Sequence, residues 1–149
     1  MEIPPVGTDG VRVGDGAEVV RTITEEDLVS FATATGDVNP LHFDEEFAQR
    51  SVLKGRVVHG MLTASLIATV LGTKFPGPGT VYLHQEMRFL RPVRVGDTVT
   101  ARVEVTEVFP EKGRARLATL CQNQRGEAVL EGTATVLLPN RMVRKGRVT

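Results

Sequence analysis

The stretch between Arg56 and Lys74 sets the strongest limit on how this chain can fold. It spans 17 residues without a formally charged side chain. From Met61 to Gly72 its apolar residues cover almost every side of a helix, which indicates a helix inside the molecule rather than on its surface. The stretch is shorter than the ~20 apolar residues of a membrane span, and it carries polar side chains such as His59 and Thr63. It therefore predicts one long buried helix in a globular protein.

Beyond Thr80 the apolar residues recur at every second position, which is the spacing of a β-strand. In the segment 80–91 this pattern places Val81, Leu83, Met87 and Phe89 on one face, which Gln85 interrupts. Further strands are predicted at 17–23, 98–108, 117–122 and 128–138. The short connections between the later strands imply antiparallel pairing. A curved antiparallel sheet wrapped around one long central helix accommodates both patterns, and this α+β architecture is the hot-dog fold.

Length and charge fit a single globular domain. The chain has 149 residues, with 18 Lys and Arg against 18 Asp and Glu, so its formal net charge is zero. A dedicated nucleic-acid-binding protein carries a basic excess, and the balance argues against that class. The last ten residues hold four basic and no acidic side chains, which leaves 14 basic against 18 acidic in the rest. We predict one domain over residues 1–139 and a basic tail over 140–149.

The single cysteine bears on the compartment. Cys121 has no second thiol with which to form an intramolecular disulfide, so nothing in the chain indicates an oxidising compartment. The first residues lack the basic and apolar regions of a signal peptide. We expect a cytoplasmic protein without a membrane partner, in which Cys121 is an inert thiol inside a strand.

Residues that can move protons gather in the segment Gly36-Asp37-Val38-Asn39-Pro40-Leu41-His42. A helix is predicted before it, from the capping box at Thr24 to Gly36, and the turn formers of the segment itself predict an irregular loop. Pro40 fixes its own φ and restricts Asn39, so the loop turns reproducibly. Asp37 and His42 in one cleft would suit general acid–base chemistry. Asx-Pro turns and structural histidines are also common, and the residues alone leave both interpretations open.

The same segment, extended by Ala48, resembles the signature of the (R)-specific enoyl-CoA hydratases, the MaoC-like or hydratase 2 family. The runs Val58-His59-Gly60-Met61 and Pro92-Val93-x-Val95-Gly96-Asp97 resemble this family too, as do Tyr82, Gln85 and Phe89. The resemblance extends from about Val13 to Leu138, and no polar position of the first motif departs from it. It implies the hot-dog fold and an enzyme that adds water reversibly to trans-2-enoyl-CoA.

The resemblance also implies a role for each residue of the motif. Asp37 would activate a water molecule for attack on the β-carbon of the enoyl thioester. His42 would share that water and protonate the α-carbon, and this syn addition gives an (R)-3-hydroxyacyl thioester. Asn39 would fix the loop and help to orient the water. The backbone N–H of Gly60, at the start of the long helix, would stabilise the enolate oxygen, whereas tight packing is the alternative reason for this glycine.

Four further residues are candidates for substrate binding. Met61, Ser65 and Ala68 lie on the predicted long helix, where small side chains either line an acyl tunnel or permit close packing against the sheet. Gln85 either contacts the catalytic loop or forms a hydrogen bond inside the core. For His59 we expect a hydrogen-bonded imidazole beside the catalytic groups, not a catalytic one.

The resulting expectation is a homodimeric hydratase that acts on an acyl-CoA substrate, with no metal and no cofactor. The three histidines are scattered and the cysteine is alone, which argues against a metal site. A (3R)-hydroxyacyl-carrier-protein dehydratase of fatty-acid synthesis is one alternative, and a hot-dog thioesterase is another. A non-catalytic acyl-thioester-binding protein would need neither Asp37 nor His42. The basic tail, with Lys54 and Arg56, could attract CoA phosphates or an acyl carrier protein, or could simply be solvated.

Overall fold

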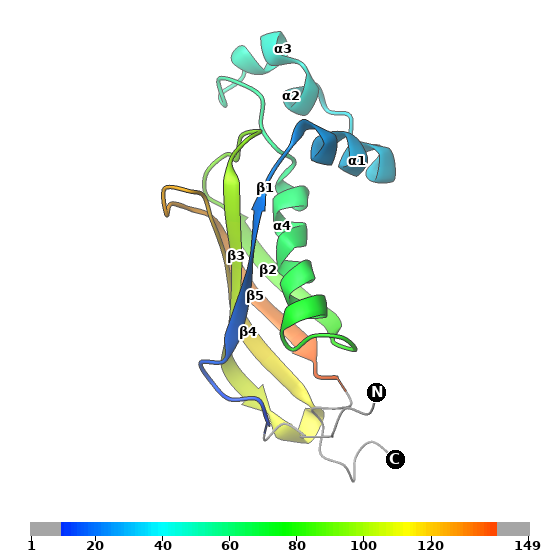
Figure 1. The fold of residues 1–149 in the computed structure, drawn as a ribbon, viewed down its shortest axis with the longest axis vertical. Coiled ribbons are helices and arrows are strands. Elements are labelled where there is room, and N and C mark those ends of the chain that lie inside the picture. The colour runs from blue at the N-terminus through cyan, green and yellow to red at the C-terminus, as the bar shows by residue number, and fades with distance from the viewer. Residues whose placement is uncertain (1–9, 140–149) are drawn as a thin grey trace.

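A computed structural model describes residues 10–139, so the predicted basic tail at 140–149 lies outside the described residues. Five strands and several helices follow one another along the chain (Figure 1). The strands are β1 (Gly16–Thr22), β2 (Val81–Phe89), β3 (Thr98–Phe109), β4 (Arg114–Gln122) and β5 (Ala128–Leu137). The helices are α1 (Glu25–Thr35), α2 (Pro40–Phe43), α3 (Glu45–Gln49) and α4 (Gly60–Thr69), with a π-turn η2 (Val70–Lys74) and a 3₁₀ turn η3 (Pro110–Lys112).

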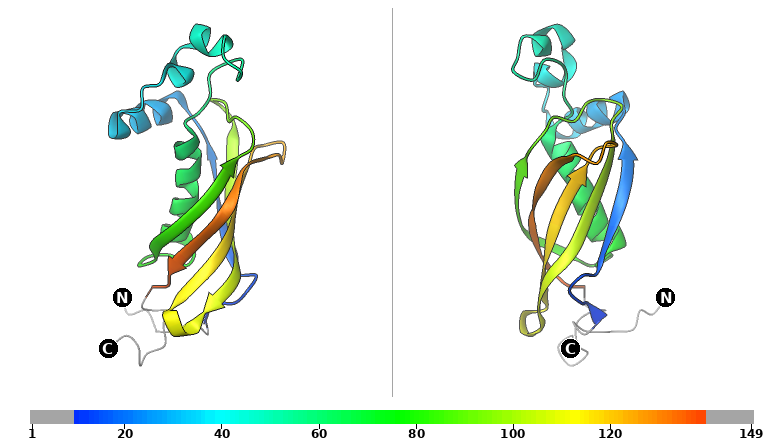
Figure 2. Two further views of the ribbon diagram at one scale, coloured as in Figure 1. Left: turned by 180° about the vertical axis from the view of Figure 1, so that it is seen from behind. Right: turned by 90° about the vertical axis from the view of Figure 1, so that its left-hand side faces the viewer.

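The five strands form one antiparallel sheet in the order β1-β3-β4-β5-β2. α4 runs along one face of this curved sheet, and α1, α2 and α3 gather at the end where α4 begins (Figures 1 and 2). The hot-dog fold predicted from the sequence is confirmed. β1 and β2 are the two edges of the sheet, so their outer backbone groups have no neighbouring strand within the described chain.

The core lies between α4 and the sheet. On β3 the alternating residues Val99, Ala101, Val103 and Val105 are all buried, as their period of two predicts. Ile67 of α4 and the first residues of η2 pack against them. None of the described helices combines the length and the apolar character that crossing a membrane requires.

The prediction that the long helix is buried on every side is wrong for the single chain. Thr63, Ala64, Leu66 and Ile67 of α4 are buried, but Met61, Ser65 and Ala68 on its other side are exposed. One sheet can cover only one side of a helix, so apolar residues on the opposite side need another partner. The side chain of Met61 is 56% exposed, which is unusual for so large an apolar residue in so apolar a helix.

β2 also departs from the predicted alternation. A bulge interrupts its pairing with β5 between Tyr82 and His84. Tyr82 therefore pairs with Val136 and Gln85 with Ala134, both core residues, so Tyr82 and Gln85 face α4. The simple period of two predicted that Val81 and Leu83 share one face with Met87 and Phe89. The bulge makes this prediction wrong.

Candidate active site

The segment between α1 and α3 is more regular than its turn formers predicted. The predicted capping box at Thr24 starts α1, and Gly36 ends the helix with φ at 80° and its N–H bonded to Ala32 O. The residues from Pro40 onward then form the short helix α2 instead of an irregular loop. Proline at the first helical position loses no hydrogen bond, so Pro40 is compatible with a helix start.

Asn39 provides the cap that makes this helix possible. Its side-chain Oδ1 accepts a hydrogen bond from the N–H of Leu41 at 3.0 Å. Its own N–H donates to Asp37 Oδ1 at 3.3 Å, and the N–H of Asp37 donates to Thr35 Oγ1 at 3.2 Å. The predicted role of Asn39 in fixing this segment is consistent with these contacts. These three local hydrogen bonds order the segment between the exposed Asp37 carboxylate and α2, the helix that carries His42.

His42 is buried, with 8% of its surface exposed. Its Nδ1 lies 2.8 Å from the backbone oxygen of Val57. A carbonyl oxygen only accepts hydrogen bonds, so Nδ1 carries the proton of the neutral ring and Nε2 keeps a free lone pair. His42 therefore has the tautomer that a base acting through Nε2 requires.

His59 connects the two candidate catalytic groups. It is 1% exposed, and its Nε2 donates a hydrogen bond of 3.0 Å to the backbone oxygen of Asp37. Its ring stacks on that of His42 with centroids 3.8 Å apart, and the rings of Phe31 and Phe43 lie against it. The expected hydrogen-bonded imidazole is present, although Nδ1 finds no hydrogen-bond partner among residues 10–139.

Asp37, His42 and His59 each place one possible ligand atom within 4.8 Å of the others. One nitrogen of each imidazole is already hydrogen-bonded to a backbone oxygen. The two rings are stacked, with centroids 3.8 Å apart. A carboxylate beside an imidazole is the pairing that general acid–base chemistry uses.

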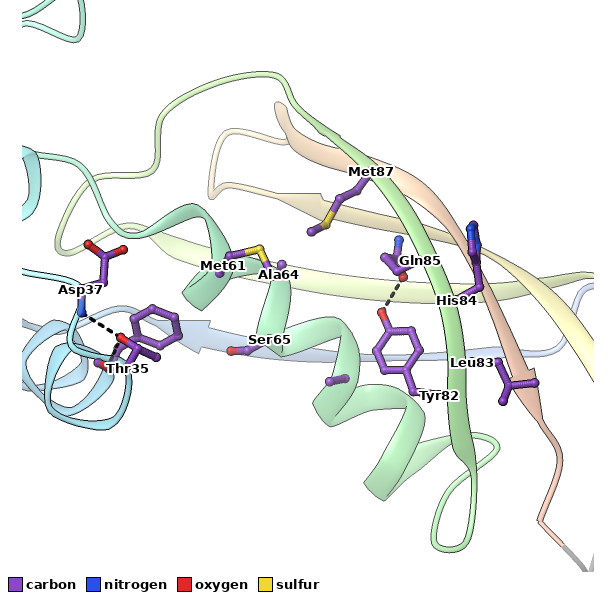
Figure 3. A pocket seen from close by; sticks show the side chains of 12 residues that line it. Thr35, Asp37, Met61, Ala64, Ser65, Tyr82, Leu83, His84, Gln85 and Met87 are labelled. Carbon is purple, nitrogen blue, oxygen red and sulfur yellow. Dashed lines mark hydrogen bonds between the residues drawn. The ribbon is translucent and has the colours of Figure 1, made fainter. Parts of the chain in front are cut away.

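An open cavity of about 820 Å³ begins at Asp37 and follows the exposed side of α4. Figure 3 shows Met61, Ala64 and Ser65 on the helix side, and Tyr82 and Gln85 pointing toward them from β2. The predicted binding residues Met61, Ser65, Ala68 and Gln85 all line this cavity together with Asp37. His42 and Asn39 do not line it. The cavity wall is mostly apolar, as an acyl chain would require.

Gly60 lines a second cavity, of about 300 Å³, together with Thr63 and Phe89. A Cβ atom on Gly60 would lie 2.8 Å from the ring of Phe89, so close packing is one reason for this glycine. The N–H groups of Gly60 and Met61 are the first of α4, and they precede the residues that donate to His59 O. Unpaired N–H groups at a helix start can receive a negatively charged oxygen.

The alternation predicted for β2 placed Tyr82 on the opposite face from Gln85, so it did not indicate that the two side chains bind each other. Its hydroxyl donates to Gln85 Oε1 at 2.5 Å, and Gln85 Nε2 donates to Thr119 Oγ1 at 3.0 Å and to Glu86 O at 2.8 Å. The amide of Gln85 is therefore engaged inside the protein. A bulge has no fixed sequence signal, and only the motif resemblance pointed to Tyr82 beforehand.

Comparison with known proteins identifies the family. Residues 14–122 match the MaoC-like domain. The chain is 46% identical over 133 residues to an (R)-specific enoyl-CoA hydratase of Rhodospirillum rubrum, covering 89% of this chain and 92% of that protein. It is 34% identical over 132 residues to a mitochondrial 3-hydroxyacyl-[acyl-carrier-protein] dehydratase of Solanum lycopersicum, covering 87% and 79%. The unliganded R-hydratase PhaJ1 of Pseudomonas aeruginosa superposes with a TM-score of 0.83 at 42% identity, covering 91% and 87%. The chain belongs to the MaoC-like family and is a hydro-lyase, the enzyme class of these hydratase and dehydratase relatives.

Proposed function

We propose that this protein is an (R)-specific enoyl-CoA hydratase, which adds water reversibly to a trans-2-enoyl-CoA and forms an (R)-3-hydroxyacyl-CoA. The observation that carries the proposal is the Asp37 carboxylate beside the His42 and His59 imidazoles, at the mouth of an apolar cavity. The carboxylate and His42 can together hold and deprotonate one water molecule. The cavity supplies an apolar wall for the acyl chain next to that water.

In this mechanism Asp37 and the unprotonated Nε2 of His42 hold the attacking water. As the water oxygen bonds to the β-carbon, one of its protons passes to this pair and the C=C electrons move toward the thioester carbonyl. A proton returned from the pair to the α-carbon completes the addition. Every atom of the product comes from the enoyl thioester and water, and no electron is gained or lost.

The negative charge that develops on the thioester oxygen needs a donor. The N–H groups of Gly60 and Met61 at the start of α4 are suited to this role because no acceptor within the helix uses them. They also begin the helix that lines the acyl cavity, so one rigid element would position both ends of the reacting group.

The mechanism requires neither a metal ion nor a redox cofactor. We propose that the enzyme acts with its own side chains alone. Prolonged dialysis against a chelator, followed by assay without added metal, should leave the hydration rate unchanged.

Two substitutions test the catalytic pair. Asp37→Asn keeps the shape but loses the base, and His42→Ala removes the imidazole, so each should lower kcat/KM for crotonyl-CoA hydration by at least about 10²-fold. Both proteins should still unfold cooperatively. Glu46→Gln, which removes an exposed carboxylate of α3, is the matched control and should keep wild-type activity. If either catalytic variant stays within about tenfold of wild type, the mechanism is wrong.

The acyl carrier remains a choice between two thioesters. The similarity to a protein named as an acyl-carrier-protein dehydratase supports that carrier as the second candidate. An assay of short, medium and long enoyl chains, each on CoA and on acyl carrier protein, separates the two. A protein that binds these thioesters without converting any of them would be a non-catalytic binding protein.

We further propose that two copies pair through β2. This edge strand and the residue after it expose Val81, Tyr82, Leu83, Phe89 and Leu90. Both edge strands carry two charged residues, but β1 exposes only one large apolar side chain, that of Val20. Tyr82 and Leu83 also line the acyl cavity beside the exposed Met61, so a second copy on this side would cover the open wall.

A further inference from the structure

The segment Leu53–Val58 joins α3 to His59 and contains no helix or strand. Among the side chains that bind its backbone is that of Arg94, in the loop between β2 and β3. The guanidinium of Arg94 donates from Nη2 to Leu53 O at 2.7 Å, and from Nη1 to Gly55 O at 2.9 Å and Arg56 O at 3.0 Å. Three backbone carbonyls of this segment therefore converge on one cation.

The backbone between these carbonyls has an unusual conformation. Lys54 has a φ of 57° and Gly55 a φ of 151°, both in the region that non-glycine residues rarely occupy. The three neighbouring carbonyls are reached from two nitrogens of one side chain, Nη1 and Nη2 of Arg94. Guanidinium has this rigid fork of donors, whereas the ammonium of lysine donates from a single nitrogen.

Arg94 is itself held in place. Its backbone N–H donates to the side chain of Asp97 at 2.9 Å, and the N–H of Asp97 donates back to Arg94 O at 3.0 Å. The preceding residue, Val93, accepts a hydrogen bond of 2.7 Å from the N–H of Val58. Hydrogen bonds therefore join the loop to both ends of the segment, at Leu53 through Arg94 and at Val58 through Val93.

The same segment makes three hydrogen bonds to α2, two of them to His42 and one to Leu41. Val57 O receives the Nδ1 proton of His42 at 2.8 Å, and Val57 N–H donates to Leu41 O at 3.1 Å. Arg56 Nε donates to His42 O at 2.7 Å. The Arg56 guanidinium also pairs with Glu25 of α1 at 2.6 Å, and the hydrogen bond from Arg56 lowers the pKa of that carboxyl.

We propose that Arg94 is a positioning residue for His42. By fixing the segment Leu53–Val58, it keeps the Val57 carbonyl against Nδ1 and so keeps the proton on Nδ1 and the lone pair on Nε2. Arg94 touches neither His42 nor the acyl cavity, and it acts only through the backbone. The consequence for turnover rests on the proposed function, whereas the effect on the His42 tautomer does not.

Arg94→Met removes all three donors and keeps an unbranched side chain. We expect kcat for crotonyl-CoA to fall at least about tenfold while KM changes less than about threefold, because small misplacement of a catalytic group slows chemistry more than it weakens binding. Arg102→Met is the matched control, since Arg102 lies on the exposed face of β3 and pairs with Glu18 and Glu104, and it should keep wild-type kinetics.

Nitrogen NMR of ¹⁵N-histidine-labelled protein reports the tautomer directly. The wild-type His42 should show the Nδ1–H form alone, and Arg94→Met should show a mixture or the Nε2–H form. A smaller loss of kcat, a loss that lies in KM, or an unchanged His42 tautomer would overturn the proposal. If Arg94→Met does not fold, Arg94→Lys takes its place, because a single ammonium nitrogen lacks the rigid fork by which Nη1 and Nη2 reach the three carbonyls. An unchanged tautomer in that variant overturns the proposal equally.

These readouts separate the two hypotheses. If the wild-type protein converts no enoyl thioester, the proposed function fails, and the tautomer comparison alone decides the role of Arg94. If the wild type is active and Arg94→Met retains both its rate and its tautomer, only the positioning role fails.

Discussion

Gln85 shows how the hydrogen bonds of a single residue decide between two roles. Its amide was a candidate for contact with the substrate or for a bond inside the core. In the structure it accepts from Tyr82 and donates to Thr119 and to Glu86 O, so its polar atoms are already engaged. Burial raises the pKa of Tyr82 to about 12, so its hydroxyl, which is protonated at neutral pH in any tyrosine, stays a donor in alkaline solution as well. Gln85 shapes the wall of the acyl cavity and leaves that wall with few free donors.

Gln85→Leu should test this assignment. It strands the hydroxyls of Tyr82 and Thr119, so we expect the free energy of unfolding to fall by about 1–3 kcal/mol in urea denaturation. The matched control is Gln49→Leu, because Gln49 is exposed and its side chain bonds to the neighbouring, exposed Glu45; its effect should be below about 0.5 kcal/mol. Equal losses in the two variants would show that the Gln85 bonds contribute nothing specific.

Among the elements, α4 combines structural and chemical roles at its first turn. Its sequence is apolar enough to fill the space over the sheet, and its start has no side-chain cap from His59. Gly60 lies where the ring of Phe89 crosses the helix, so the position must stay without a side chain. The same turn carries the N–H groups that we assign to the enolate oxygen.

A double substitution separates packing from chemistry at Gly60. Gly60→Ala should destabilise the protein by about 1–3 kcal/mol because its Cβ meets the Phe89 ring. In a Phe89→Ala background that clash is absent, and the same change should be neutral or stabilising by up to about 1 kcal/mol, since alanine favours a helix more than glycine does. Chemical denaturation of the four proteins measures both effects. An undiminished loss in the Phe89→Ala background would contradict the packing explanation.

For the whole molecule, the apolar residues of β2 and the exposed side of α4 are the main unexplained surface. Within residues 10–139 no other element covers them, although the helix sequence is apolar on nearly all sides. A second copy that extends the sheet would cover both and would close the acyl cavity.

Light scattering after size-exclusion chromatography tests the pairing. The wild type should have twice the 16.2 kDa mass of one chain. Leu83→Lys places a charge on the exposed part of β2 and should shift the protein toward the monomer, with a loss of activity. Val20→Lys, at an exposed position of the other edge strand, should remain dimeric. A monomeric wild type, or equal effects of both lysines, would rule out pairing through β2.

Features that depend on interactions between residues close in the chain were mostly predicted correctly. The cap at Thr24, the stop at Gly36 and the alternation of Val99 to Val105 are all present as predicted. Two of the wrong predictions share one cause: the bulge in β2 and the open side of α4 depend on neighbours far away in the chain. The helix α2 is different, because its cap Asn39 and its first residue Pro40 are local signals that the prediction of an irregular loop overlooked. The fold, the family and the hydro-lyase class are confirmed, whereas the cytoplasmic location remains a prediction.

The sequence by itself determined the helix-and-sheet architecture and the acid–base residue types, because hydrophobic period, capping and motif spacing act over a few residues. Only the tertiary structure decided the state of those residues. The Nδ1 proton of His42 lies against the carbonyl of Val57, 15 positions away in the chain. The segment that contains Val57 is bound in turn by Arg94, which is 41 positions from Leu53. Hydrogen bonds and ring stacking act over only a few ångströms, so their partners are set by how the chain folds back on itself and not by spacing along it.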